Sequence, residues 1–300
     1  MVEINLPTPI EKLHFDGMEF FLKRDDLISL EFSGNKARKL FSFLNSDMKN
    51  IHTLISYGST QSNAMYSLSV LAKIRGLRFI YYTTHLNAFL KNNPHGNYLE
   101  ALKNGMELIV REDKPLKSNF LEDDGILFIE EGGRDSYANN GLKILADEIV
   151  DWRDKNQLSN LNIFLPSGTG TTALFLQKNI KQHDIKVYTT PCVGDEFYLL
   201  EQFGMLSSDK KDYPTILKPP KKYHFGKLYR ESYEIWLKLR NKTHIEFDMV
   251  YDPIGFLTLM QYKELFSENL LYIHQGGLIG NESMLERYKR KFDENIKHRR

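Results

Sequence analysis

Short apolar runs alternate with helical patterns along most of the chain. The runs are rich in β-branched and aromatic residues, as buried strands are, and they cover 52–58, 78–84, 106–110, 126–133, 162–168, 186–191 and 270–277. Between them, apolar residues recur every three or four positions, which predicts helices over 62–75, 96–104, 139–153, 171–182, 230–241 and 282–294. This alternation predicts an α/β fold with mainly parallel sheets covered by helices on both faces.

The order of these elements predicts two three-layer αβα domains without a flexible tether. No internal repeat or low-complexity linker is visible, so the chain must cross from one domain to the other and back. We expect a large domain of residues 1–44 and 151–300 and a small domain of residues 45–150. Several strands end in glycine-rich or polar turns, so the ligand site should lie where these carboxyl ends meet.

The composition is that of an ordinary soluble globular protein. Of 300 residues, 41% are hydrophobic, and 40 basic residues nearly balance 39 acidic ones. The net charge of +1 gives no reason to expect nucleic-acid binding, and we interpret the basic tail 297–300 as a solvated face. No apolar run approaches the roughly 20 residues of a membrane span, and no secretion signal is recognisable. We therefore expect a cytoplasmic protein. Its single cysteine, Cys192, excludes an internal disulfide and a multi-cysteine metal site.

The stretch PSGTGTTALFLQ, 166–177, has the pattern of a phosphate-binding turn between a strand and a helix. Gly168 and Gly170 allow a tight turn with inward amides, and neighbouring threonines add hydroxyl donors. The Gly-Lys-Ser/Thr of a nucleotide-triphosphate loop is missing. The spacing of the glycines and Ala173 fits a dinucleotide fingerprint, but the ribose-binding acid expected about 20 residues later is absent. Tight packing without a ligand stays possible for such a turn.

The stretch YGSTQSNAM, 57–65, is a second turn of this kind. Gln61, Ser62 and Asn63 lie where the next helix should begin, and free amides at a helix start favour a carboxylate or another anion. The simpler interpretation is a helix N-cap by Ser59 or Thr60.

The third candidate is Lys36, which follows the small, flexible run Ser33-Gly34-Asn35 at the start of a helical pattern. An isolated lysine of this kind is usually a surface residue. A lysine becomes a nucleophile when burial or a helix start lowers its pKa. An accessible lysine, a phosphate turn without nucleotide markers and a second anion site are together what pyridoxal phosphate requires.

Five segments carry a family resemblance: KRDDLISLEFSGNKARKL, YGSTQSNAMYSLSVLAKIRGL, EEGGRDSYANNGLKILADEI, PSGTGTTALF and IHQGG. In order and spacing they resemble the 1-aminocyclopropane-1-carboxylate deaminase and D-cysteine desulfhydrase family of fold-type II pyridoxal-phosphate enzymes. The resemblance implies a fold like that of the tryptophan synthase β subunit, pyridoxal 5′-phosphate as cofactor, a small amino acid as substrate and a homodimer.

The resemblance also implies residue roles. Lys36 would form the Schiff base with the cofactor, Asn63 would bind its phenolic oxygen, and Gln61 and Ser62 would hold the substrate carboxylate. Ser62 and Tyr229 would join Lys36 in catalysis. The remaining implied cofactor contacts are Gly168, Thr169, Gly170 and Thr171 at the phosphate, and Gln275 in place of the threonine or leucine that usually precedes Gly-Gly.

The segment YDPIGFLTL, 251–259, departs from the family. Gly255 and Phe256 stand where a stacking tyrosine and a glutamate or threonine are usual. Without a carboxylate beside the pyridine nitrogen the ring is a weaker electron sink, which favours β-elimination of a good leaving group over cyclopropane opening. Replacement of the tyrosine by Gly255 would enlarge the site, so we expect a substrate bulkier than cysteine.

The expected mechanism begins when the substrate replaces Lys36 on the cofactor. Released Lys36 removes the α-proton, the β-substituent leaves, and a keto acid and ammonia form. We expect a lyase or hydrolase that resembles D-cysteine desulfhydrase. The alternatives are a deaminase that opens the cyclopropane or acts on a small D-amino acid, a cofactor-binding homologue that has lost catalysis, and, last, a nicotinamide-dependent dehydrogenase.

Overall fold

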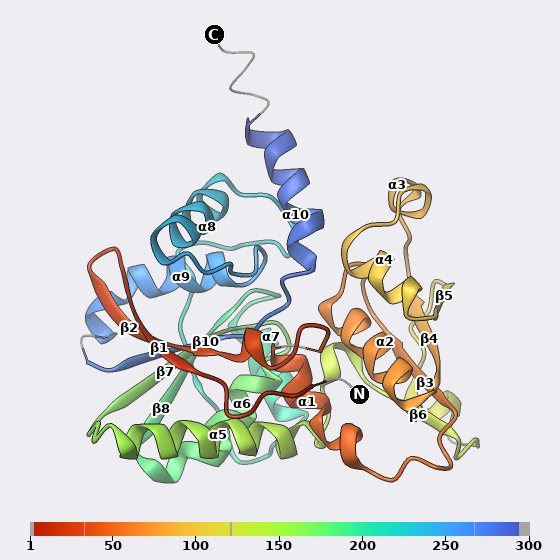
Figure 1. Cartoon of the computed structure of the whole chain (residues 1–300), viewed down its shortest axis with the longest axis horizontal. Coiled ribbons are helices and arrows are strands. Elements are labelled where there is room, and N and C mark those ends of the chain that lie inside the picture. Colours follow the sequence, from red (N-terminus) through yellow and green to blue (C-terminus); the bar gives the residue numbers. More distant parts are fainter. Residues whose placement is uncertain (1–2, 33, 121, 267, 294–300) are drawn as a thin grey trace.

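The computed structural model describes residues 3–32, 34–120, 122–266 and 268–293. Ser33 of the lysine stretch and the expected helix end and basic tail at 294–300 lie outside these ranges. Figure 1 shows two units side by side, each built on its own sheet. In the described part of the chain, no helix is long and apolar enough to cross a membrane.

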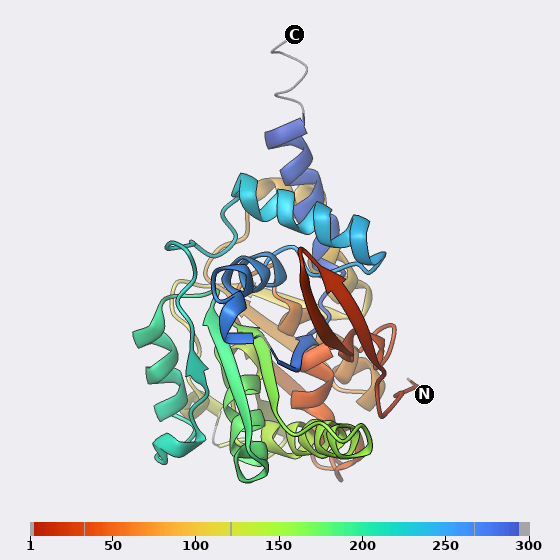
Figure 2. The same cartoon turned by 90° about the vertical axis from the view of Figure 1, so that its left-hand side faces the viewer.

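The larger unit is built on a six-stranded sheet in the order β1-β2-β10-β7-β8-β9. Strands β1 and β2 form an antiparallel hairpin, and the other strands are parallel, with Leu165 of β7 opposite Thr189 of β8. Figure 2 shows the hairpin and β9 at opposite edges of this sheet. The strands are Ile10–Phe15 (β1), Met18–Arg24 (β2), Leu161–Ser167 (β7), Ile185–Pro191 (β8), Thr215–Ile216 (β9) and Leu270–His274 (β10).

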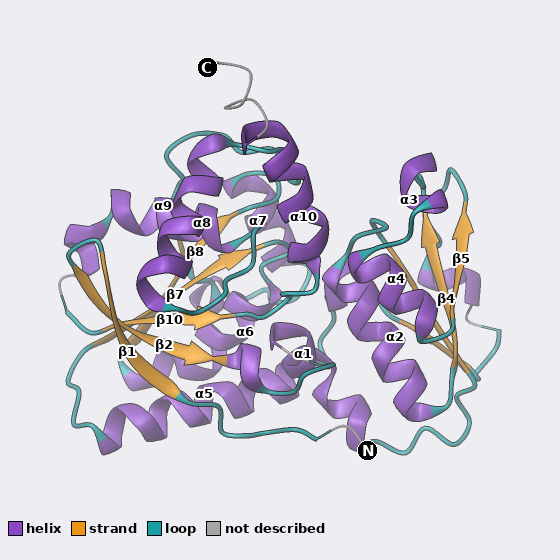
Figure 3. Ribbon diagram, turned by 45° about the horizontal axis from the view of Figure 1, so that its top comes forward, coloured by secondary structure: helices purple, strands orange, loops and turns teal. Residues whose placement is uncertain are grey.

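Helices cover both faces of this sheet, as Figure 3 shows. One face packs on α5 (Ala138–Lys155) and α6 (Thr171–Ile180) through a core of aliphatic residues. The other packs on α8 (Arg230–Thr243) and α9 (Asp252–Gln261) through an aromatic core around Trp236 and Phe256. Helices α7 (Glu196–Gly204) and α10 (Gly280–Tyr288), followed by a π-helical turn at Lys289–Asp293, complete this unit.

The smaller unit has a four-stranded parallel sheet in the order β5-β4-β3-β6. Its strands are Thr53–Tyr57 (β3), Arg78–Thr83 (β4), Met106–Val110 (β5) and Ile126–Phe128 (β6). One core joins it to α2 (Asn63–Arg75), α3 (Ala88–Asn92), α4 (Gly96–Lys103) and α1 (Gly34–Asn45). Helix α1 also packs on α5, so it connects the two units.

The structure corrects the expected domain boundary at residue 150. Helix α5 was placed with the small domain, but its apolar face, including Leu142, Leu145 and Ile149, lies in the core of the six-stranded sheet. The small unit therefore ends after β6, before Ala138. The division into two sheets and the α/β class agree with the sequence prediction.

Candidate active site

Lys36 lies in the first turn of α1, and its side chain is partly buried. Its Nζ donates a hydrogen bond to Asn35 Oδ1 at 3.0 Å. Burial lowers the pKa of Lys36 to about 8, although the carboxylate of Asp248 opposes the shift. A useful fraction of the amine is therefore neutral near physiological pH, as a nucleophile or a base requires.

Gln275 fixes the start of α1 against the sheet. Its Oε1 accepts a hydrogen bond from Asn35 Nδ2 at 2.9 Å, and its Nε2 donates to the Pro166 carbonyl at 2.6 Å. A Cβ at Gly34 would lie 1.7 Å from the Gln275 carbonyl oxygen, so only glycine fits there. Gln275 thus positions Lys36, and its direct contact with a cofactor stays a prediction.

The expected phosphate turn follows β7, and α6 begins at its end with no side-chain cap. Its first amides are therefore free for an anion. A Cβ at Gly170 would lie 2.4 Å from Phe203 Cε1, which requires glycine at this turn. The hydroxyls of Thr169 and Thr171 lie 3.0 Å apart, and the buried Thr172 hydroxyl has no hydrogen-bond partner among the residues that the structure describes. These free donors fit a phosphate group.

Lys39 is a basic residue beside this turn. The sequence analysis did not identify it. It is buried, and its Nζ donates to the Gly132 carbonyl at 3.1 Å. A Cβ at Gly132 would lie 3.2 Å from Thr169 Cγ2, so Lys39 and the turn meet there. Burial and the charges of Lys36 and Arg134 hold its pKa well below the usual range. The i, i+3 spacing from Lys36, which places both lysines on one helix face, was the available signal.

At the second turn, Ser62 is the N-cap of α2, in place of the expected Ser59 or Thr60. Its Oγ accepts the amides of Ala64 at 3.1 Å and Met65 at 3.4 Å. The lone pairs of the hydroxyl are therefore engaged in the helix. Its proton faces the Tyr81 hydroxyl, so a substrate carboxylate would compete with Tyr81 for it.

The neighbours of Ser62 point polar groups into the same region. Asn63 Oδ1 accepts Asn97 Nδ2 at 2.7 Å, which leaves the Asn63 amide nitrogen as a donor. Within the described ranges, the buried Gln61 Oε1 has no hydrogen-bond partner. The structure therefore brings the predicted residues 61–63 together at one helix start.

Asp248 is a buried carboxylate that sequence reasoning did not find. Its Oδ1 accepts the amides of Val250 at 2.8 Å and Tyr251 at 2.6 Å. Its Oδ2 is buried, and among the described residues only the Asn63 side chain interacts with the carboxylate from the other side. Burial, reinforced by the charge of Asp252, raises the pKa of Asp248 to about 7, and the nearby Asn63 amide moderates the shift. Asp248 thus joins the starts of α1 and α2 electrostatically. No motif in the sequence marks it.

Tyr229 lies in the loop before α8, and its hydroxyl accepts the His224 amide at 3.0 Å. Its ring packs on Tyr223, with the ring centres 5.0 Å apart. The polar atom of Tyr229 is thus engaged within its own loop. Tyr251 is the tyrosine beside the phosphate turn, because its Oη lies 3.2 Å from the position of a Cβ at Gly168.

The expectation that Gly255 enlarges the site is wrong. A Cβ at Gly255 would lie 2.8 Å from the Tyr272 hydroxyl and 3.4 Å from Pro166 Cβ, so these side chains already fill the space. Phe256 is fully buried and faces the aromatic core, where its ring lies 4.5 Å from that of Tyr272. Both residues serve the packing of α9.

Comparison with known proteins supports the resemblance seen in the sequence. A scan against profiles of protein families finds no match. The chain is 25% identical, over 306 aligned positions, to a Thermotoga maritima protein that is provisionally named 1-aminocyclopropane-1-carboxylate deaminase. This match covers 91% of the chain and 95% of the relative.

Solved structures share the fold. A homologue of 1-aminocyclopropane-1-carboxylate deaminase has a TM-score of 0.78 at 24% identity and covers 95% of this chain and 94% of its own. A hydrogen sulfide-producing enzyme from Fusobacterium nucleatum has a TM-score of 0.64 at 13% identity, with 90% and 95% covered. A pyridoxal 5′-phosphate-dependent aspartate racemase has a TM-score of 0.60 at 13% identity, with 90% of each chain covered. The chain thus shares its fold with a protein that is named as a pyridoxal-phosphate-dependent enzyme.

Proposed function

We propose that the protein is a pyridoxal-phosphate-dependent lyase that removes a β-substituent from an amino acid and releases a keto acid and ammonia. The observation that carries this proposal is the amine of Lys36, which is partly buried in the first turn of α1 and has its pKa lowered to about 8. The names of its relatives, a deaminase and a sulfide-producing enzyme, favour a lyase over the hydrolase class that was also expected.

In this proposal the cofactor supplies an electron sink that stabilises negative charge at the substrate Cα. The free amides of α6 and the threonine hydroxyls would hold its phosphate, and the Lys39 ammonium would offset the phosphate charge. The Asn63 amide nitrogen would donate to its phenolic oxygen. A phosphate near Lys39 would also remove the cost of burying this lysine without a counter-charge.

The chain's own groups would then carry the proton transfers. The start of α2 would hold the substrate carboxylate through the Ser62 hydroxyl proton and the Gln61 amide nitrogen, since only donors bind a carboxylate. Lys36 Nζ would accept the α-proton, since a pKa of about 8 lies close to working pH. Asn35 and Gln275 would keep the amine in place throughout.

Cyclopropane ring opening is the second candidate, and Asp248 is the observation that favours it. The positions that carry the family's carboxylate and stacking ring face the core here. A buried carboxylate, that of Asp248, nevertheless lies near Lys36 and interacts with the Asn63 side chain. If Asp248 reaches the pyridine ring, it would restore the stronger electron sink that ring opening requires.

A keto-acid assay on the protein loaded with pyridoxal phosphate separates these proposals. We expect pyruvate from D- or L-cysteine or β-chloroalanine, and no 2-oxobutyrate from 1-aminocyclopropane-1-carboxylate. The reverse pattern would favour ring opening. A protein that binds pyridoxal phosphate but turns over neither class of substrate would be a homologue without catalysis. A colourless protein that binds NADH would favour the dehydrogenase alternative. The cytoplasmic location and the homodimer stay predictions from the sequence.

A further inference from the structure

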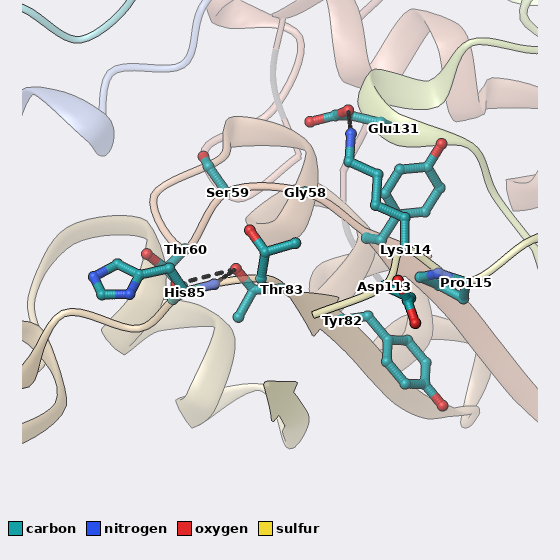
Figure 4. Close-up of a pocket in the computed structure, with 12 residues that line it drawn as sticks. Gly58, Ser59, Thr60, Tyr82, Thr83, His85, Asp113, Lys114, Pro115 and Glu131 are labelled. Atoms are coloured by element: carbon teal, nitrogen blue, oxygen red, sulfur yellow. Dashed lines mark hydrogen bonds and ion pairs between the residues drawn. The ribbon is translucent and has the colours of Figure 1, made fainter. Parts of the chain in front are cut away.

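The polar turn before α2 has an open half and an enclosed half. Gly58, Ser59 and Thr60 line a cavity of about 350 Å³, as Figure 4 shows, and on this side the lining ends at Thr60. The next residues, 61–63, lie against Asn97, a buried residue in the first turn of α4. In the enclosed half, partners within the protein therefore set the direction of a side-chain amide.

A backbone carbonyl fixes the direction of the Asn97 amide. Asn97 Nδ2 donates to the Gln61 carbonyl oxygen at 2.9 Å and to Asn63 Oδ1 at 2.7 Å. Because a carbonyl oxygen only accepts hydrogen bonds, the nitrogen of Asn97, and not its oxygen, must face Gln61. The same nitrogen faces Asn63, so Asn63 must turn its oxygen toward Asn97.

On its other side, the Asn63 amide meets the larger unit. The Asn63 side chain donates a hydrogen bond to the buried carboxylate of Asp248. An ionised carboxylate only accepts, so this contact requires the amide nitrogen of Asn63 on that side. A reversed Asn63 amide would set its NH2 group against that of Asn97 and its oxygen against Asp248. The two neighbours therefore favour the same orientation.

Packing between the two units encloses both amides. A Cβ at Gly277 would lie 2.3 Å from Asn63 Nδ2, and one at Gly280 would lie 3.3 Å from Asn97 Nδ2. The amide of Gly96, next to Asn97, donates to Glu282 Oε2 of α10 at 3.2 Å. Asn97 is thus held in place by packing as well as by hydrogen bonds, as a residue that positions another must be.

We propose that Asn97 is a positioning residue that holds the Asn63 amide with its nitrogen toward the phenolic oxygen of the cofactor. The proposal rests on the proposed function, in which pyridoxal phosphate binds and Asn63 donates to that oxygen. The Asn63 nitrogen carries two protons, so one serves Asp248 and the other is available to the cofactor. A donor at this place stabilises the ionised form of the phenolic oxygen.

The isosteric variant Asn97→Asp tests the proposal, because it replaces the donor that faces Asn63 by an acceptor. The Asn63 NH2 group should then turn toward residue 97 and leave its oxygen toward the cofactor. In protein loaded with pyridoxal phosphate, the phenolate form of the Schiff base absorbs at longer wavelength than the phenol form, and hydrogen bonds to the cofactor set their balance. We expect the ratio of long- to short-wavelength absorbance to fall by about tenfold or more, because a hydrogen bond to a charged oxygen is lost.

Asn104→Asp is the matched control, since it makes the same change at the other end of α4, where Asn104 Oδ1 accepts a hydrogen bond from Lys73 at 3.1 Å. This variant should leave the absorbance ratio as it is in wild type. An unchanged ratio in Asn97→Asp as well, with the wild-type bands present, would overturn the positioning role while the cofactor assignment stands.

A double-mutant cycle separates an effect through Asn63 from an effect of the added charge. In the Asn63→Ala background, Asn97→Asp should change the absorbance ratio by less than about twofold, because the amide on which residue 97 acts is gone. A change in this background as large as in wild type would show that residue 97 acts on the cofactor by its charge. That result would overturn the proposal.

Asn97→Ala decides the case in which the buried carboxylate of Asn97→Asp prevents folding. It removes the donor without adding a charge, so the Asn63 amide is free to turn, and the absorbance ratio should fall by about threefold or more. An unchanged ratio would overturn the positioning role. Because the readout does not depend on turnover, a failure of the lyase activity alone would leave these results in place. A wild-type protein that shows neither band with pyridoxal phosphate would refute the cofactor, and the proposal with it.

Discussion

At the residue scale, the environment of Lys36 predicts how the protein captures its cofactor. The amine must be neutral to attack an aldehyde, and burial lowers its pKa to about 8. The rate at which cofactor-free protein takes up pyridoxal phosphate should rise with pH and level off above about 8. Stopped-flow absorbance measures this rate. A rate that keeps rising toward pH 10 would indicate an ordinary exposed lysine.

Asp248 contributes to the pKa of Lys36, because its negative charge raises that pKa. Asp248→Asn should therefore move the midpoint of the same pH profile to lower pH. An exposed control, Asp47→Asn, should leave it in place. A midpoint that does not move would show that the Asp248 carboxylate has no influence on Lys36.

The burial of Lys39 predicts that its removal weakens cofactor binding without lowering the stability of the cofactor-free protein. It is buried, and among the described residues its hydrogen-bond partner is the Gly132 carbonyl. Charging its amine therefore costs free energy, which a bound anion would offset. Lys39→Met should weaken the binding of pyridoxal phosphate by about tenfold or more while the melting temperature of the cofactor-free protein stays equal or rises. Unchanged cofactor affinity would contradict the assignment.

The sequence identified residues in recognisable turns and missed those that act through burial. Lys36, Asn63 and the glycine-threonine turn stand in local motifs, so their convergence could be predicted. Asp248 gained its role because the loop before α9 brings it close to Lys36 and Asn63, which no local pattern encodes. Gly255 was misjudged because the space beside it belongs to Tyr272.

At the scale of elements, Ser62 at the N-cap of α2 should contribute both to the stability of the helix and to substrate binding. Ser62→Ala removes two accepted hydrogen bonds and should lower the free energy of unfolding by about 1 kcal/mol. Ser62→Asp keeps the cap, so its melting temperature should match wild type, but its charge should repel the substrate carboxylate and raise KM by about tenfold. An unchanged KM in Ser62→Asp would limit Ser62 to capping.

The elements that the sequence analysis missed have specific causes. Helix α9 is buried on nearly all sides, so its apolar residues show no helical period. The pair Asp16-Gly17, which is typical of hairpin turns, lies between alternating apolar positions and indicates the hairpin of β1 and β2. This signal was overlooked. The central strands β3 and β7 were found because nearly all of their residues are buried and no charged residue interrupts them. The edge strand β1 contains Glu11 and Lys12 and is mostly not buried.

At the scale of the whole molecule, a buried ion network fixes α1 to the large sheet. Arg38 pairs with Asp25 at 2.8 Å and with Glu148 of α5 at 2.7 Å, and Lys23 of β2 also reaches Glu148, at 2.6 Å. Helix α1 carries both Lys36 and Lys39, so this network sets the position of the site between the two units.

Removal of Arg38 should therefore be costly. Arg38→Met leaves two buried carboxylates without their main partner, and we expect a loss of about 3 kcal/mol in the free energy of unfolding, measured by urea denaturation. Lys143→Met, which breaks an exposed pair with Asp147, should cost less than about 1 kcal/mol. Similar losses in both variants would contradict the structural role of the network.

The central claim is that Lys36 is the amine that binds the cofactor. The most direct test is borohydride reduction of the protein loaded with pyridoxal phosphate, followed by mass spectrometry of its peptides. We predict one reduced adduct, on Lys36, which is absent from Lys36→Ala and retained in the exposed control Lys49→Ala. An adduct on Lys39 or another lysine, or no adduct at all, would contradict the account.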